Sequence, residues 1–161
     1  MGVQAKNPFV NDEIDNDQNA GEESGAVEVA LTDIDHVAIA VYDLDEALDD
    51  YRETFGVTVD HRELLDADGV EVAMLEVGDS YIQLLTPTRD DSPLAAFLDE
   101  RGPGLHHVGY RVADCAAALA AVVDQGHEVV DHEPQPGARD TTVAFVHPRA
   151  LHGTLIQLVE V

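Results

Sequence analysis

Two histidines and two glutamines stand at matching places in two similar parts of this chain. His36 in IDHVAIAV corresponds to His107 in LHHVGYRV at an offset of 71 residues, and Gln83 in YIQLL corresponds to Gln157 in LIQLV. Imidazole nitrogens and amide oxygens are metal ligands, and a buried amide without a partner is costly. The four residues therefore predict a divalent-metal site. The alternative is that each of them is a hydrogen-bonded core residue.

The stretches that carry these residues are typical of β-strands, in which successive side chains point to opposite faces. In the first stretch His36 shares a face with Ala38, and in the second His107 shares a face with Gly109 and Arg111. The small residue beside each histidine leaves room for a ligand on that face.

Each histidine strand is followed by a sequence that predicts an amphipathic helix. Asp43 and Asp114 are the expected N-caps, and Gly56 and Gly126 the expected helix ends. The apolar faces are expected to consist of Leu44, Ala47, Leu48, Tyr51 and Phe55, and of Cys115, Leu119, Val122 and Val123. Three strands are expected after each helix, near 57–63, 70–77 and 80–86, and near 127–132, 141–147 and 153–160.

This repeated order predicts an α+β fold of two βαβββ modules that form one cupped, eight-stranded mixed sheet with the helices outside. The ordered domain is expected over 31–161, with module one at 33–88, a helical linker at 92–102 and module two at 105–161. Residues 1–30 are acidic and have few large apolar side chains, which is typical of a disordered tail.

Acidic side chains outnumber basic ones by 33 to 8, for a net charge of −25, and Lys6 is the only lysine. This balance excludes the basic footprint of nucleic-acid binding and disfavours an anionic membrane surface, and no apolar run reaches membrane-spanning length. Either a cationic partner or a salt-rich cytoplasm would suit such a surface, and the even spread of the acids favours the second. Cys115 is the only cysteine, which indicates a reducing, cytoplasmic setting.

The chain resembles the vicinal oxygen chelate superfamily, and within it the methylmalonyl-CoA epimerases, in the stretches DHVAIAV, YRETFG, GPGLHHVGYRV, VAFVHPR and GTLIQL. The resemblance covers about residues 33–161. It implies that His36, Gln83, His107 and Gln157 hold a divalent metal, with cobalt expected and manganese, zinc or nickel as alternatives. In that family the metal polarises substrate carbonyls, so that a base and an acid can move the C2 proton of an acyl-CoA. The implied function is interconversion of (2R)- and (2S)-methylmalonyl-CoA, and a homodimer is expected.

Position 157 departs from the family, which has a glutamate there as both ligand and catalytic base. Gln157 cannot accept a proton at neutral pH. A second family glutamate would stand where this chain has Val72. Glu76, on the same strand face, is then the candidate base, with a metal-bound hydroxide or His106 as alternatives. Strand alternation places His106 on the face opposite His107, which favours a structural role for it over a proton relay.

Three arginines are candidate contacts for an acyl-CoA, because an anionic substrate needs local positive charge in so acidic a chain. Arg149 lies in the HPR stretch, Arg139 in the loop before it, and Arg111 on the His107 strand.

Other functions stay open. Another metal-dependent member of the superfamily, such as a lactoylglutathione lyase, also needs a carboxylate for proton transfer. An extradiol dioxygenase is disfavoured because its iron site requires a carboxylate ligand. A non-catalytic relative that binds a metal or a small molecule would explain why both family bases are missing.

Overall fold

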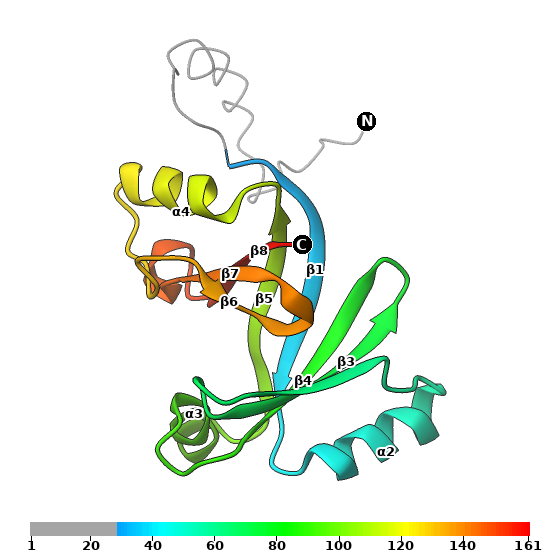
Figure 1. Ribbon diagram of the computed structural model, residues 1–161. Coiled ribbons are helices and arrows are strands. Elements are labelled where there is room, and N and C mark those ends of the chain that lie inside the picture. The colour runs from blue at the N-terminus through cyan, green and yellow to red at the C-terminus, as the bar shows by residue number, and fades with distance from the viewer. Residues whose placement is uncertain (1–28) are drawn as a thin grey trace, which may run out of the picture.

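The computed structural model describes residues 29–161 (Figure 1). Eight strands form one mixed sheet in the order β2-β3-β4-β1-β5-β8-β7-β6. This arrangement confirms the predicted fold class of two βαβββ modules in one curled sheet. The predicted tail covers 1–30, and residues 1–28 of it lie outside the described residues.

The two modules share one order of strand, α-helix and three strands, to which module two adds two 3-10 helices. Module one comprises β1 (Leu31–Ala40), α2 (Leu44–Phe55), β2 (His61–Leu65), β3 (Val70–Val77) and β4 (Ser80–Pro87). The linker helix is α3 (Pro93–Arg101). Module two comprises β5 (Gly104–Val112), α4 (Cys115–Asp124), β6 (Gln135–Pro136), the 3-10 helix η2 (Ala138–Asp140), β7 (Thr142–Val146), the 3-10 helix η3 (Pro148–Ala150) and β8 (Ile156–Glu160). None of the helices in the described part of the chain has the length and apolar character needed to cross a membrane.

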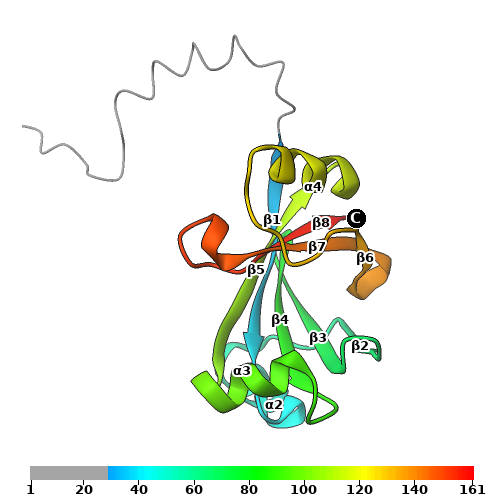
Figure 2. The ribbon, with the colours of Figure 1, turned by 90° about the vertical axis from the view of Figure 1, so that its left-hand side faces the viewer.

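The central strands β1 and β5 join the modules as an antiparallel pair. Each also pairs in parallel with the last strand of its own module, β4 or β8, and the remaining pairs are antiparallel. Two views show the other elements of module one toward one end of this central pair and those of module two toward the other (Figures 1 and 2). The sheet therefore has an approximate twofold relation between its halves.

The helix ends follow the predicted capping pattern. The carboxylate of Asp43 accepts a hydrogen bond from the backbone N–H of Glu46, and Asp114 accepts one from Ala117. Gly56 ends α2 with a φ of 70°, a left-handed conformation that glycine adopts without a Cβ clash. Equivalent aspartates thus start α2 and α4, the helices of the two modules.

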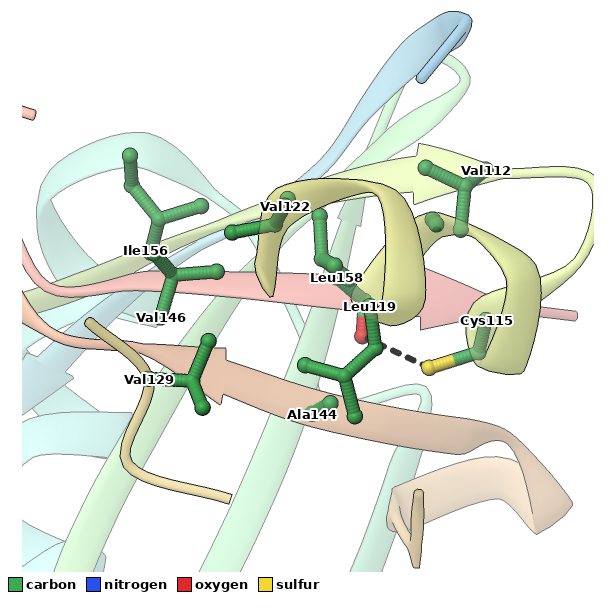
Figure 3. Packing of buried hydrophobic residues seen from close by; sticks show 10 residues of the cluster. Val112, Cys115, Leu119, Val122, Val129, Ala144, Val146, Ile156 and Leu158 are labelled. Carbon is green, nitrogen blue, oxygen red and sulfur yellow. Dashed lines mark hydrogen bonds between the residues drawn. The ribbon is translucent and has the colours of Figure 1, made fainter. Parts of the chain in front are cut away.

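Each module has an apolar core beneath its own helix. Under α4, Leu119 and Val122 pack with sheet residues such as Ile156 and Leu158 (Figure 3). Under α2 the buried cluster consists of Leu44, Ala73, Leu75 and Leu84. Because side chains alternate along a strand, this packing leaves the opposite face of the sheet for a site.

The predicted helix faces were wrong at two positions. Phe55 is 69% exposed and Val123 is 46% exposed. Phe55 is the last residue of α2, and its ring lies 5.8 Å, between centroids, from that of Tyr51 of the same helix. Val123 follows Val122 and is turned about 100° further around the helix, away from the sheet.

The predicted strand at 127–132 was also wrong. Within that segment Val129 forms an isolated bridge with Val146, and the edge strand lies instead at Gln135–Pro136. Pro134 and Pro136 have no N–H to donate to a ladder, so this edge stays short.

The linker helix α3 packs on the other side of the sheet from α2 and α4. Its Leu94 and Leu98 form a buried cluster with Ala38, Ala40 and Leu85. The linker is therefore a helix, as predicted, but it covers the inner face of the sheet instead of the outside. It forms part of the wall of the cavity described next.

Candidate active site

A cavity of about 410 Å³ opens on the inner face of the sheet, and all four predicted metal ligands line it. His36, Gln83, His107 and Gln157 are buried, with at most 9% of each residue exposed. The apolar part of the wall includes Val72, Leu85, Leu94, Val143 and Phe145. A few polar groups in a mainly apolar cavity are typical of a small-molecule site.

Strand register brings the four predicted ligands together. The central strands place them in two rows across the sheet, and each row has a small residue in the middle. The rows are Gln83–Ala38–His107 and His36–Gly109–Gln157. Each module therefore contributes one of the four residues to each row.

Gly109 makes room for the imidazole of His36. A Cβ on Gly109 would lie 2.3 Å from Cε1 and 2.6 Å from Nδ1 of that ring. The ring thus rests on the backbone of β5. The equivalent position in module one is Ala38, which has a methyl group.

The two histidine rings meet edge to face, with centroids 5.1 Å apart and planes at 86°. Their Nε2 atoms are 3.0 Å apart. Ring nitrogens this close together can both face one ion. The spacing of these nitrogens therefore fits a shared cation.

The two glutamines supply amide oxygens to the same cavity. The side-chain NH2 of Gln83 donates to the sulfur of Met74 at 3.4 Å, which leaves its carbonyl oxygen free. In the described part of the chain, no group of three or more His, Cys, Asp or Glu side chains could hold a metal ion. A metal site here would therefore use the amides beside the two histidines, and a set of two imidazoles and two amide oxygens suits a divalent cation.

Asp35 contacts Nδ1 of His36, and the sequence did not predict this role for it. This carboxylate is fully buried and lies 2.7 Å from Nδ1 of His36. It also accepts hydrogen bonds from Nε and Nη2 of Arg111, at 3.2 and 2.7 Å, and from Nη2 of Arg139 at 2.6 Å. Burial alone would raise the pKa of Asp35. The hydrogen bonds from His36 and Arg111 and the charge of Arg139 outweigh burial and lower the pKa to about 2.

His106 is the equivalent of Asp35 in module two. Its Nδ1 lies 2.8 Å from Nδ1 of His107. Leu105 and His107 pair with adjacent residues of β1, so His106 is the extra residue of a β-bulge. The bulge turns His106 toward the cavity, which it lines. The prediction that His106 faces away from His107 was wrong, because strand alternation does not hold across a bulge.

Burial sets the protonation of the module two histidines. Burial, with a smaller effect of the Arg101 charge, lowers the pKa of His106 to about 4. Burial, with the neighbouring His36 and His106 rings, lowers the pKa of His107 well below its usual value. Phe97 of α3 packs edge to face on His106 at 4.8 Å, so the linker helix also fixes this ring.

The structure separates the three predicted substrate arginines. Arg139 lines the cavity, and its guanidinium stacks over Tyr81 at 4.4 Å. Arg111 lines a second hollow of about 400 Å³, which Arg139 also borders. Arg149 is exposed, pairs with Glu128 at 3.3 Å and is absent from the described lining of the cavity. Of these three arginines, Arg139 is thus the one that lines the cavity of the predicted ligands.

The predicted base Glu76 lies away from this cavity. It is exposed and borders the second hollow. Val72 does line the cavity, as predicted for the position of the second family glutamate. Among residues 29–161 the cavity wall includes no glutamate, and its titratable groups besides the two ligand histidines are Asp68, His106, Asp131 and Arg139.

Comparison with known proteins gives consistent matches. Residues 35–145 match the family model of the glyoxalase/bleomycin resistance protein/dioxygenase superfamily. The ethylmalonyl-CoA/methylmalonyl-CoA epimerase of Cereibacter sphaeroides is 38% identical over 131 residues, which cover 80% of this chain and 97% of that protein.

Two solved structures share the fold at similar identity. A methylmalonyl-CoA epimerase in complex with methylmalonyl-CoA and ammonium is 41% identical, with a TM-score of 0.78 over 81% of this chain and 95% of that one. The methylmalonyl-CoA epimerase of Mycobacterium tuberculosis is 36% identical, with a TM-score of 0.78 over 85% of this chain and 95% of that one.

Proposed function

The chain belongs to the glyoxalase/bleomycin resistance protein/dioxygenase superfamily, and from this premise we propose that it is a methylmalonyl-CoA epimerase. Its relatives and structural neighbours at 31–41% identity include several methylmalonyl-CoA epimerases. The observation that carries the proposal is the convergence of one histidine and one glutamine from each module in a single cavity.

His36, Gln83, His107 and Gln157 would hold a divalent metal, for which cobalt is the first candidate and manganese, zinc and nickel are alternatives. When bound, the metal polarises the carbonyls of the substrate and makes the C2 proton more acidic. The apolar wall around the four ligands excludes water from the reacting carbon. Burial of the two histidines keeps their rings in place for this task.

Arg139 is the proposed contact for the free carboxylate of the substrate. Its Nε is buried and has no hydrogen-bond partner among residues 29–161, so a ligand carboxylate would satisfy it. Arg111 supports Arg139 through the Asp35 carboxylate that both bind. Arg149 lies outside the cavity and is proposed to contact the phosphates of CoA.

Proton transfer at C2 is the step for which the chain differs from its family. Gln157 can bind a metal but cannot take the proton. His106 lines the cavity and contacts His107, whereas Glu76 does not line the cavity. His106 is therefore a better candidate than Glu76 for moving the proton.

Solvent-deuterium exchange at C2 of methylmalonyl-CoA tests the proposal. The wild type is assayed in high-salt buffer with cobalt, manganese or zinc, beside Gln157→Glu and the control Gln125→Glu, which adds a carboxylate at the exposed end of α4. We expect exchange by the wild type, and an increase of up to about 10²–10⁴-fold in Gln157→Glu, the usual contribution of a proton-transfer residue.

Other outcomes of the same assay decide between the alternatives. Exchange by Gln157→Glu alone would mean that the chain keeps an epimerase site without its base and is a binding relative. Absence of exchange in both the wild type and Gln157→Glu would overturn the proposal. Turnover of the hemithioacetal of glutathione would favour the lactoylglutathione lyase alternative.

Three further properties are proposed from the resemblance and the composition. The net charge of −25 supports a salt-rich cytoplasm as the setting. It also supports the absence of nucleic-acid and membrane partners. A homodimer follows from the resemblance, and light scattering at high salt tests it.

A further inference from the structure

The loop that carries Arg139 belongs to module two, but β2 of module one holds it. The backbone N–H of Arg139 donates to Oε1 of Glu63 at 2.9 Å. His61, two residues earlier on β2, lies 2.6 Å from the same oxygen through its Nε2. Glu63 therefore joins the first module to the loop between β6 and β7, which lies far from it in the sequence.

The contacts of Glu63 show that it is an ionised carboxylate here. Burial alone would raise the pKa of Glu63, but the hydrogen bonds from the Arg139 N–H and from His61 outweigh burial and lower the pKa. An ionised carboxylate only accepts hydrogen bonds, so Glu63 receives both donors. Its side chain is 29% exposed. The contact with Arg139 is thus partly shielded from water, which strengthens it.

The backbone of this loop has a conformation that needs support. Arg139 and the next residue, Asp140, have φ values of 61° and 56°, in the left-handed region that residues with a Cβ rarely adopt. Local contacts close the loop, since the hydroxyl and the backbone N–H of Thr141 both donate to the carbonyl oxygen of Ala138. These contacts do not join the loop to module one. A strained conformation persists where its surroundings hold it, and Glu63 supplies such a contact.

The guanidinium of Arg139 is held by two further contacts. Its Nη2 donates to the buried Asp35 at 2.6 Å, and the group stacks over the ring of Tyr81 at 4.4 Å. The buried Nε has no partner among residues 29–161. A guanidinium is planar and presents its N–H groups in fixed directions. The direction of the Nε–H therefore depends on the backbone from which the side chain starts.

We propose that Glu63 is a positioning residue, which fixes Arg139 so that the site selects acyl groups with a free carboxylate. This inference rests on the proposed function, because it takes Arg139 as the contact for that carboxylate. Among residues 29–161, Glu63 is not one of those that line the cavity. It therefore acts on a substrate through Arg139 and not by direct contact.

Calorimetric binding of two acyl-CoA thioesters tests this selection without requiring turnover. Methylmalonyl-CoA has a free carboxylate at C2, and isobutyryl-CoA has a methyl group in its place. The protein is loaded with cobalt for both titrations. We expect the wild type to bind methylmalonyl-CoA about 10–100-fold more tightly, as expected for hydrogen bonds to a charged group. Equal affinities would overturn the proposal.

Three variants separate positioning from a merely structural role. Glu63→Leu should lower the preference for methylmalonyl-CoA about 10-fold and leave the affinity for isobutyryl-CoA nearly unchanged. Glu63→Gln keeps an oxygen that can accept from the Arg139 N–H, and should keep most of the preference. Glu71→Leu is the matched control, since it breaks a contact with Arg62 at 2.8 Å on the same hairpin, outside the cavity wall. Equal weakening of both thioesters by Glu63→Leu would contradict the proposal.

A double-mutant cycle shows whether Glu63 acts through Arg139. In Arg139→Gln the preference should already be lost, so that adding Glu63→Leu changes it no further. Additive losses would overturn the proposal. If Glu63→Leu does not fold, Glu63→Asp takes its place, because a carboxylate that is shorter by one methylene group no longer reaches the N–H. Full preference in Glu63→Asp would likewise refute the role of Glu63.

The outcomes separate this inference from the proposed function. A preference that Glu63→Leu lowers, without deuterium exchange at C2 by the wild type, would support the role of Glu63 and refute the epimerase. Exchange at C2, together with equal affinities of the wild type for the two thioesters, would support the epimerase and refute the role of Glu63.

Discussion

The two modules hold equivalent ligand histidines with different chemistry. In module one the residue before the ligand is Asp35, a charged acceptor that two arginines fix in place. In module two it is His106, a neutral ring that can accept or donate. The same position of a duplicated strand is thus rigid in one module and adjustable in the other. A site built from two copies can therefore place a fixed carboxylate beside one histidine and a second imidazole beside the other.

A second difference concerns the residue beneath each ring. Module two has Gly109 under His36, and module one has Ala38 at the equivalent place. The ring of His36 therefore lies closer to the sheet than a side chain on β5 would allow. The two histidines are not interchangeable in space, although their sequences align.

Among the variants, Gly109→Ala should have the largest effect on the site, and it tests the difference between the two histidine positions. The new Cβ would meet Cε1 of His36 at 2.3 Å, so the ring must move. Misplacement of a site group by about 1 Å can cost about 100-fold, and we expect losses of that size in deuterium exchange and zinc affinity. Ala38→Gly is the matched control, since it removes a methyl group without pushing a ring. Comparable losses in both variants would refute the difference between the modules.

Arg139→Gln should have the next largest effect, on stability. It removes a hydrogen bond to the fully buried Asp35, and we expect the free energy of unfolding to fall by about 1–3 kcal/mol. Arg149→Gln removes an exposed pair with Glu128 and should cost less than about 0.5 kcal/mol. Urea denaturation of both variants gives the comparison. Equal costs would mean that Asp35 does not depend on Arg139.

Acid should first remove the stability that depends on His106 of module two, and only at lower pH the stability that depends on Asp35 of module one. The pKa of His106 falls from 6.5 to about 4 on folding, so the unfolded chain binds more protons and stability falls as pH drops from about 6.5 to 4. The pKa of Asp35 falls from 3.8 to about 2, so its contribution is lost only between about pH 4 and 2. Unfolding free energies measured across this range should show that His106→Asn flattens the slope between pH 6.5 and 4. An unchanged slope would exclude His106 as its source.

The helix caps should give small and nearly equal effects in the two modules. Asp43→Ala and Asp114→Ala each remove one side-chain acceptor from a helix start. Each should lower the free energy of unfolding by about 1 kcal/mol. Thermal or urea denaturation checks this, and a large difference between the two would show that the modules are unequal outside the site as well.

Much of the fold could be predicted from the sequence, because its elements repeat with clear periods. The four inner-face residues His36, Gln83, His107 and Gln157 were placed by strand alternation, and they line one cavity. The apolar pattern of 127–132 wrongly predicted a strand there, and nothing in that pattern argues against one. In the structure the pairing with β7 is made by Gln135–Pro136, and Val129 forms only an isolated bridge.

The roles of the residues around the ligands were beyond sequence reasoning. Glu76 had the right strand parity but stands at the exposed end of β3, bordering a different hollow. Arg139 reaches the cavity because η2 holds it at a φ of 61°, with its backbone N–H bonded to Glu63 of module one. Residue types do not show how far along a strand the cavity extends. They also do not show which loop residue adopts a left-handed conformation.

The sequence by itself determined the duplication, the helix caps and the four inner-face residues, because these depend on local periodicity and on spacing. Tertiary structure alone decided which neighbours complete the site. A register shift before His36 and a bulge at His106 break the alternation of the central strands, and so bring Asp35 and His106 against the ligand rings. Such irregularities arise from the pairing of β1 with β5, two strands far apart in the sequence. No local sequence pattern predicts them.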